Sequence, residues 1–208
     1  MELFYSRVSG NSTRAAFALF ESGAAWTPRL VDPHADETRR AEYLALNPMG
    51  KVPALTDGAV VLWESNAINW YVAEKNPEAG LLPTTVAGRA AVQRWLYFQV
   101  GHVSPACHPI FLATNARVQA FWNVKGDDRA VTAARRELAR FLPVLDRALE
   151  KQEWLEGELS LADLAYAPHL WLIADGGFDF APFPAVRAWL ERLLARPAWR
   201  KATELVWG

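Results

Sequence analysis

The sequence predicts a two-domain protein, with an α+β domain followed by an all-helical domain. Three observations support this fold class. Short apolar segments separated by turn residues fill the first third of the 208-residue chain, as expected for strands that alternate with helices. A proline-bounded stretch then interrupts the chain, and beyond it apolar residues recur with helical spacing. We therefore expect an α+β domain at residues 1–76, a linker at 77–86 and a helical domain at 87–208.

The first domain contains alternating strand and helix signals. Gly23 ends the first predicted helix, Asp57-Gly58 forms a hairpin turn, and Asn76-Pro77 stops the last helix. The predicted strands are Leu3–Tyr5, Trp26–Val31, Val52–Thr56 and Val60–Trp63, and the predicted helices are Arg14–Ser22, Ala41–Leu46 and Asn66–Lys75. This order of strands and helices is that of a thioredoxin-like domain.

Helical periods dominate the second domain. The longest predicted helix carries a stripe of apolar residues on one face: Leu138, Phe141, Leu142, Leu145 and Leu149. The segment His102–Phe111 holds two prolines and is expected to interrupt the first helix of this domain. The predicted helices are Val86–Gly101, Asp127–Lys151, a helix opened by the capping box Ser160–Asp163, Pro184–Arg196 and Pro197–Leu205.

Composition and charge argue against several classes of protein. A formal net charge of −1 and a pI near 6.4 give no electrostatic basis for binding nucleic acid or an anionic membrane. The single cysteine, Cys107, cannot form an internal disulfide and fits a reducing compartment. The first residues lack the pattern of a signal peptide, and no apolar run approaches the ~18 residues of a spanning helix. We expect a cytoplasmic protein that does not enter the membrane.

The stretch from Asn47 to Ser65 is the part of the sequence most indicative of function. Asn47-Pro48-Met49-Gly50 is a turn, and Pro53 stands at the mouth of the strand that follows. The backbone of Val52 is then available to pair with an extended peptide. Glu64 offers a carboxylate for an ammonium group, and Ser65, as an expected N-cap, offers a hydroxyl beside a helix N-terminus for a carboxylate. A ligand with an α-amino-acid head and a peptide body fits this arrangement.

This ordered pattern, Asn-Pro-Met-Gly-Lys-Val-Pro-Ala-Leu at residues 47–55 followed by Leu-Trp-Glu-Ser-Asn-Ala-Ile at 62–68, resembles the glutathione-binding signature of the cytosolic glutathione transferases. The resemblance implies glutathione as co-substrate, a mixed four-stranded sheet and a homodimer. It also implies that Pro53 is cis, that Val52 pairs with the cysteinyl unit, and that Glu64 and Ser65 hold the γ-glutamyl head. Lys51, within the signature, is the candidate for the glycyl carboxylate, ahead of His34, Arg39 and Arg40.

The loop before the first helix is rich in hydroxyl groups. Serine-type members of the family activate the thiol with a hydroxyl in this loop, and their Ser-x-x-x-x-Arg pattern places Ser9 at that catalytic position. Asn11 lies two residues further on and is the second catalytic candidate. Ser12 is expected to cap the helix. Tyr5 is a rival donor, although its place inside a strand favours a core role.

Residues His102, Ala106 and Phe111 are candidates for contact with a hydrophobic electrophile. The resemblance implies that the first helix of the second domain faces the glutathione sulfur. Packing between the domains is an equally good explanation of these residues. His102, Cys107 and His108 do not share a helical face and have no adjacent acidic partner, so we expect no metal site here.

We therefore expect a glutathione transferase, which activates the thiol of glutathione for attack on an electrophile. Two alternatives use the same residues. The first is another glutathione enzyme on the same fold, either an isomerase or a disulfide or peroxide reductase, and Asn11 near Ser9 is compatible with the reductase. A transferase-like binding protein without catalysis is the second alternative, and the presence of Ser9, Lys51, Glu64 and Ser65 argues against it.

Overall fold

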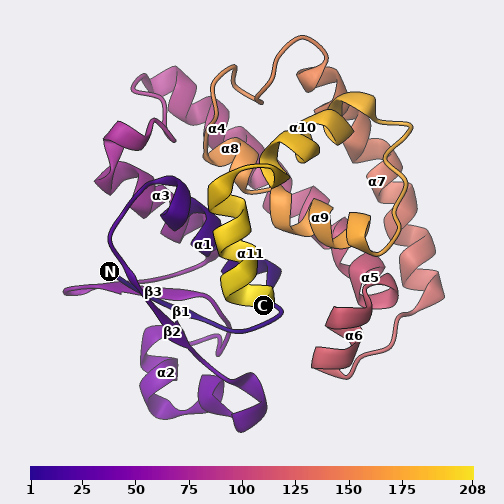
Figure 1. Ribbon diagram of the computed structural model, residues 1–208. Coiled ribbons are helices and arrows are strands. Elements are labelled where there is room, and N and C mark those ends of the chain that lie inside the picture. Colours follow the sequence, from indigo (N-terminus) through magenta and orange to yellow (C-terminus); the bar gives the residue numbers. More distant parts are fainter. The chain divides into compact units, whose positions relative to one another are not determined.

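The computed structural model describes residues 1–208, which divide into two units (Figure 1). The first unit comprises Met1–Leu81 together with Arg196–Gly208, and the second comprises Leu82–Ala195. The sequence assigned all residues after 86 to the helical domain. In the structure, the contacts of the last helix group it with the N-terminal unit instead.

The first unit is built on a four-stranded mixed sheet with the order β2-β1-β3-β4. The strands are β1 (Glu2–Tyr5), β2 (Thr27–Leu30), β3 (Ala54–Asp57) and β4 (Val60–Trp63). β1 pairs in parallel with β2 and antiparallel with β3, while β3 and β4 form the predicted hairpin. Leu3 and Leu55 face each other across β1 and β3, and both are fully buried. The sequence prediction of a thioredoxin-like sheet is confirmed.

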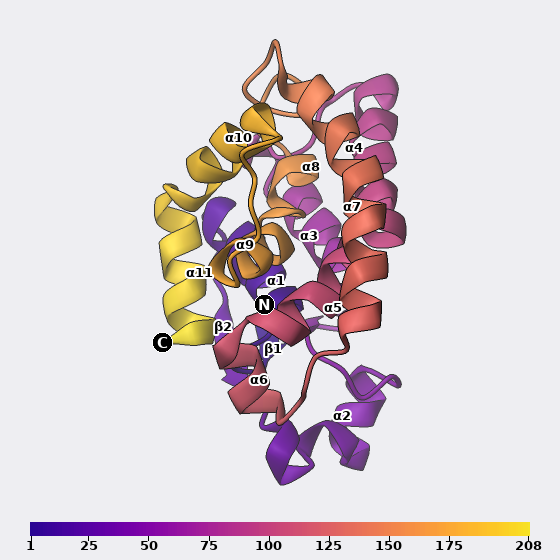
Figure 2. The same ribbon diagram turned by 90° about the vertical axis from the view of Figure 1, so that its right-hand side faces the viewer.

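Helices cover both faces of this sheet. They are α1 (Gly10–Glu21), α2 (Ala41–Leu46), α3 (Ser65–Lys75) and α11 (Pro197–Trp207), with short 3₁₀ turns at Pro33–Ala35, Glu37–Arg39 and Pro77–Ala79. α1 packs against α3 and α11, whereas α2 lies on the other side of the sheet (Figures 1 and 2). The fully buried ring of Phe17, in α1, packs edge-on against Trp199 in α11.

Two helix starts in the first unit differ from the sequence prediction. α1 begins at Gly10 rather than Arg14, because Ser9 and not Ser12 is its N-cap. Ser12 lies inside the first turn and is fully buried. α3 begins at Ser65, so the N-cap position belongs to Glu64, whose side chain makes no capping hydrogen bond. Ser65 is therefore the first helical residue and not the cap.

The second unit is helical. It contains α4 (Val86–Phe98), a π-helical turn (Gln99–Val103), α5 (Ser104–Thr114), α6 (Ala116–Trp122), α7 (Asp128–Leu149), α8 (Leu161–Leu164), α9 (Ala167–Asp175) and α10 (Pro184–Leu194). α7 packs against α5 and α10, and its leucine stripe is buried as predicted. No helix in the structure combines the length and apolarity that crossing a membrane requires.

The prediction that His102–Phe111 interrupts the first helix is wrong. The π-helical turn carries the chain directly from α4 into α5, and α5 contains both prolines. Pro105 stands in the first turn of α5, directly after the π-helical turn, and Pro109 lies inside α5. π-Helical turns of this kind insert one extra residue without ending the helix.

The predicted capping box is present at the start of α8. The Ser160 hydroxyl accepts a backbone N–H, and the carboxylate of Asp163 accepts the N–H of Ser160 at 2.9 Å. Asp163 also accepts the indole N–H of Trp189, in α10, and the backbone N–H of Leu155. This buried carboxylate therefore ties α8 to α10 and to the loop before it, which is a structural role.

Candidate functional site

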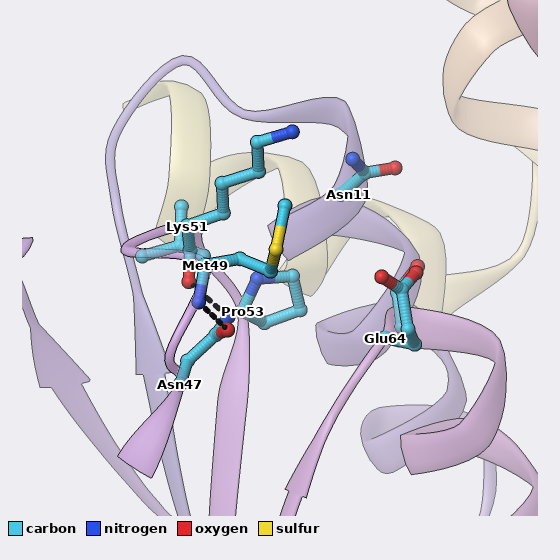
Figure 3. Close-up of a pocket in the computed structure, with 8 residues that line it drawn as sticks. Asn11, Asn47, Met49, Lys51, Pro53 and Glu64 are labelled. Atoms are coloured by element: carbon cyan, nitrogen blue, oxygen red, sulfur yellow. Dashed lines mark hydrogen bonds between the residues drawn. The ribbon is translucent and has the colours of Figure 1, made fainter. Parts of the chain in front are cut away.

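The loop between α2 and β3 is held in shape by the side chains of Asn47 and Tyr43. The side-chain amide of Asn47 donates to the carbonyl of Lys51 at 2.6 Å, and its oxygen accepts the N–H of Met49 at 3.0 Å (Figure 3). The phenol of Tyr43 donates to the same Lys51 carbonyl at 2.7 Å. Burial raises the pKa of Tyr43, so this phenol remains a donor throughout the physiological range. Two donors thus fix the peptide group that leads into Val52.

Val52 presents a free backbone edge. The Val52–Pro53 peptide bond is cis, in agreement with the sequence expectation. Val52 lies outside the strand pairs, and none of the loop and turn hydrogen bonds involves its N–H or C=O. An extended peptide could therefore pair with this residue through its own backbone.

Glu64 joins β4 to α3 in a strained conformation. Its φ of 69° lies in a region that non-glycine residues rarely adopt. Strain of this kind is common where a side chain must be aimed at a ligand. It places the exposed Glu64 carboxylate beside the first turn of α3, whose backbone dipole favours an anion. The Ser65 hydroxyl accepts a hydrogen bond at 2.9 Å from Nη1 of Arg14, in α1.

Eight residues line an open pocket between these elements: Asn11, Asn47, Met49, Lys51, Val52, Pro53, Glu64 and Ser65. The exposed side chains of Lys51 and Glu64 lie on different walls, with Met49 above Pro53 between them (Figure 3). The pocket therefore offers an ammonium on one wall, a carboxylate on another and a free peptide edge in between. This arrangement is complementary to a short peptide that carries both an amino group and a carboxylate.

The first turn of α1 contributes Asn11 to the pocket, whereas Ser9, the N-cap, does not line it. The Ser9 hydroxyl accepts the N–H of Ser12 at 3.2 Å, as an N-cap does. Asn11 accepts a hydrogen bond at 2.5 Å from Nη1 of Arg14 through its side-chain oxygen. The Ser12 hydroxyl turns inward, toward the N–H of Ser6. Tyr5 is buried in the core, as predicted.

The three predicted electrophile contacts do not share one surface. His102 and Ala106 line an open groove of about 430 Å³ within the second unit, together with Phe141 and alanines of α7. The His102 ring packs against Phe98 and Phe141. Phe111 lies outside this groove, is only 7% exposed, and packs against the rings of His108 and His169.

Three residues of the site were missed by reasoning from sequence. Asn47 and Met49 belong to the motif, but their residue types predict only a turn. Asparagine two residues before a backbone N–H is a known turn-stabilising pattern, so the Asn47–Met49 bond had a local signal. Arg14 is the arginine of the Ser-x-x-x-x-Arg pattern, but its contact with Ser65 joins residues far apart in the chain and has no local signal.

Comparison with known proteins gives consistent matches. The family models for the glutathione S-transferase N-terminal and C-terminal domains match residues 1–74 and 101–197. A probable glutathione S-transferase, GSTF2, of Oryza sativa subsp. japonica is 33% identical over 211 residues, covering 99% of this chain and 97% of the rice protein.

Two solved structures extend this similarity to the fold. Glutathione S-transferase-I bound with lactoylglutathione superposes with a TM-score of 0.89 at 30% identity, covering 98% of both chains. The glutathione transferase URE2P8 of Phanerochaete chrysosporium, solved with oxidized glutathione, gives a TM-score of 0.84 at 31% identity, covering 98% of this chain and 93% of that one.

Proposed function

Because the chain belongs to the glutathione S-transferase family, we propose that the pocket around Pro53 binds glutathione. The protein is a glutathione transferase, an enzyme that activates the thiol of glutathione as a thiolate for attack on an electrophile. The observation that supports this pocket most is its charge pattern, with Lys51 and Glu64 on different walls and the unpaired backbone of Val52 between them. Glutathione is a short peptide with an amino-acid head and a free carboxylate at its other end.

Each part of the ligand has a partner in this proposal. The Glu64 carboxylate accepts a hydrogen bond from the ammonium of the γ-glutamyl head. The carboxylate of that head accepts hydrogen bonds from the Ser65 hydroxyl and from the backbone N–H groups at the N-terminus of α3. The backbone of Val52 pairs with the cysteinyl unit. Lys51 holds the glycyl carboxylate at the rim.

The catalytic step depends on the state of the thiol. The thiolate is the nucleophile, and an unperturbed thiol is mostly protonated at neutral pH. Hydrogen bonds donated to the sulfur stabilise its charged form and lower its pKa. We assign these donors to the Ser9 hydroxyl and the Asn11 side-chain amide. The N-terminus of α1 adds a favourable dipole.

Replacement of Glu64 tests the assignment of the head group. Glu64→Ala removes the acceptor of a charged hydrogen bond and is expected to weaken glutathione binding by about 1.5–3 kcal/mol. Calorimetric titration measures this loss directly. Glu78→Ala, at another exposed glutamate of the first unit, is the matched control and should bind as the unchanged protein does. Equal affinities for all three proteins would contradict the assignment.

The electrophile and the assembly of the protein are further parts of the proposal. We assign His102 and Ala106 to contact with a hydrophobic electrophile, because an imidazole and a methyl group line the same largely apolar groove. His102→Ala should raise the KM for a hydrophobic electrophile and leave glutathione affinity unchanged.

We also propose that the protein is a cytoplasmic homodimer. Sedimentation equilibrium of the purified protein tests the dimer.

A further inference from the structure

Arg14 is buried and contacts two residues that line the pocket. The arginine is 3% exposed, which is unusual for a charged side chain. Its Nη1 atom donates to the side-chain oxygen of Asn11 at 2.5 Å and to the hydroxyl oxygen of Ser65 at 2.9 Å. One terminal nitrogen carries two hydrogens, so both bonds can be made at once. The guanidinium therefore links α1 to the start of α3.

These two bonds determine which way the polar groups of Asn11 and Ser65 face. An amide whose oxygen accepts a hydrogen bond from Arg14 must turn its NH₂ group away from that donor. Figure 3 shows the Asn11 nitrogen on the side of Lys51 and the oxygen directed away from it. A hydroxyl that accepts from Arg14 likewise keeps its own proton as a donor. The same arginine thus leaves two donors available to the pocket.

From this geometry we propose that Arg14 is a positioning residue that orients two donors toward glutathione. It acts through Asn11 on the thiolate and through Ser65 on the γ-glutamyl carboxylate, and it does not touch either group itself. This inference rests on the proposed binding of glutathione in the pocket. It adds that thiol activation and head-group binding share one buried side chain.

The test separates orientation from charge. Arg14→Met removes the charge and both hydrogen bonds, whereas Arg14→Lys keeps a positive charge but lacks the planar fork of a guanidinium. Both variants should raise the thiol pKa of bound glutathione by about one unit and weaken glutathione binding about tenfold, as expected for lost charge-assisted hydrogen bonds. Thiolate absorbance against pH and calorimetry measure these changes. A lysine variant that matches the unchanged protein in both would overturn the proposal, since charge alone would then suffice.

A double-mutant cycle distinguishes positioning from a purely structural role. In an Asn11→Ala background, Arg14→Lys should cause little further change in the thiol pKa, because the residue it acts through is already absent. If the changes in thiol pKa caused by Asn11→Ala and Arg14→Lys simply add in the double variant, the proposal is overturned. Ser22→Ala removes a buried hydroxyl that bonds Leu19 at the far end of α1, and it controls for loss of helix stability. It should leave the thiol pKa unchanged. If Arg14→Met does not fold, the lysine variant and the double-mutant cycle still test the positioning role of Arg14.

Failure of this inference is distinguishable from failure of the proposed function. If the unchanged protein does not bind glutathione in calorimetry, the proposed function fails. Crystal structures of the unchanged protein and of Arg14→Lys then still report the orientation of the two side chains. We expect the Asn11 amide and the Ser65 hydroxyl to rotate in the variant. Unchanged orientations in the variant would overturn the positioning role.

Discussion

At the scale of single residues, the Ser9 hydroxyl combines two functions on one oxygen atom. It accepts the N–H of Ser12 at 3.2 Å, which caps α1, and its own proton remains available as a donor. The sequence placed the cap at Ser12, because both serines precede a helical segment and local pattern does not distinguish them. The structure of the first helical turn shows which serine is the N-cap, because this turn buries the Ser12 side chain in the core.

Replacement of Ser9 should therefore affect both stability and catalysis. Ser9→Ala is expected to lower the free energy of unfolding by about 1 kcal/mol as a lost cap. It should also raise the pKa of the bound thiol by roughly one to two units, as a lost charge-assisted hydrogen bond. Denaturant unfolding and thiolate absorbance measure the two effects. Ser9→Gly separates them, since glycine caps almost as well but has no hydroxyl. A normal thiol pKa in the glycine variant would mean that Asn11 or backbone amides activate the thiol.

At the scale of elements, the strands, hairpin and helices of the first unit were predictable because each has a local signal. β4 and α2 match their predicted bounds, and the turn at Asp57-Gly58 matches its hairpin pattern. The loop from Asn47 to Pro53 was recognised as a turn, yet its internal bonding was not predictable. Its shape depends on Tyr43, which belongs to α2 and reaches the Lys51 carbonyl from outside the motif.

The loop should respond differently to its two donors. Tyr43→Phe removes one of the two bonds to the Lys51 carbonyl, and is expected to lower the free energy of unfolding by about 1 kcal/mol with a small loss of glutathione affinity. Asn47→Ala removes the other bond and also the contact with Met49, so it should weaken glutathione binding more strongly. Calorimetric titration of both variants with glutathione shows which substitution weakens binding more. A larger loss of affinity for Tyr43→Phe would contradict this account of the loop.

At the scale of the whole molecule, the first unit is completed by residues from the far end of the chain. Val8 donates its N–H to the carbonyl of Val206, and the indole of Trp207 donates to the hydroxyl of Thr13 at 2.8 Å. Arg196 forms a salt bridge with Glu21. The sequence identifies this last segment as an amphipathic helix, but periodicity does not reveal which surface it covers. Contacts between residues almost 200 positions apart leave no local trace in the sequence.

The second unit contains a carboxylate whose titration is coupled to folding. Asp163 is completely buried, and burial raises its pKa from 3.8 to about 6, against the opposing effect of the hydrogen bonds from Leu155, Ser160 and Trp189. The folded state therefore holds the proton more tightly than the unfolded chain does. The associated stabilisation is fully present below about pH 4 and is lost as the pH rises through 6.

Asp163→Asn should remove this pH dependence. A shift of about two pKa units corresponds to roughly 3 kcal/mol, so the free energy of unfolding of the unchanged protein should fall by up to that amount between pH 4 and pH 7, relative to the asparagine variant. The variant is also expected to be less stable at every pH, because its amide cannot accept all the donors that meet at this carboxylate. Urea unfolding across this range measures both effects. Parallel pH profiles for the two proteins would show that Asp163 keeps an ordinary pKa, with the hydrogen bonds that it accepts offsetting the cost of burial.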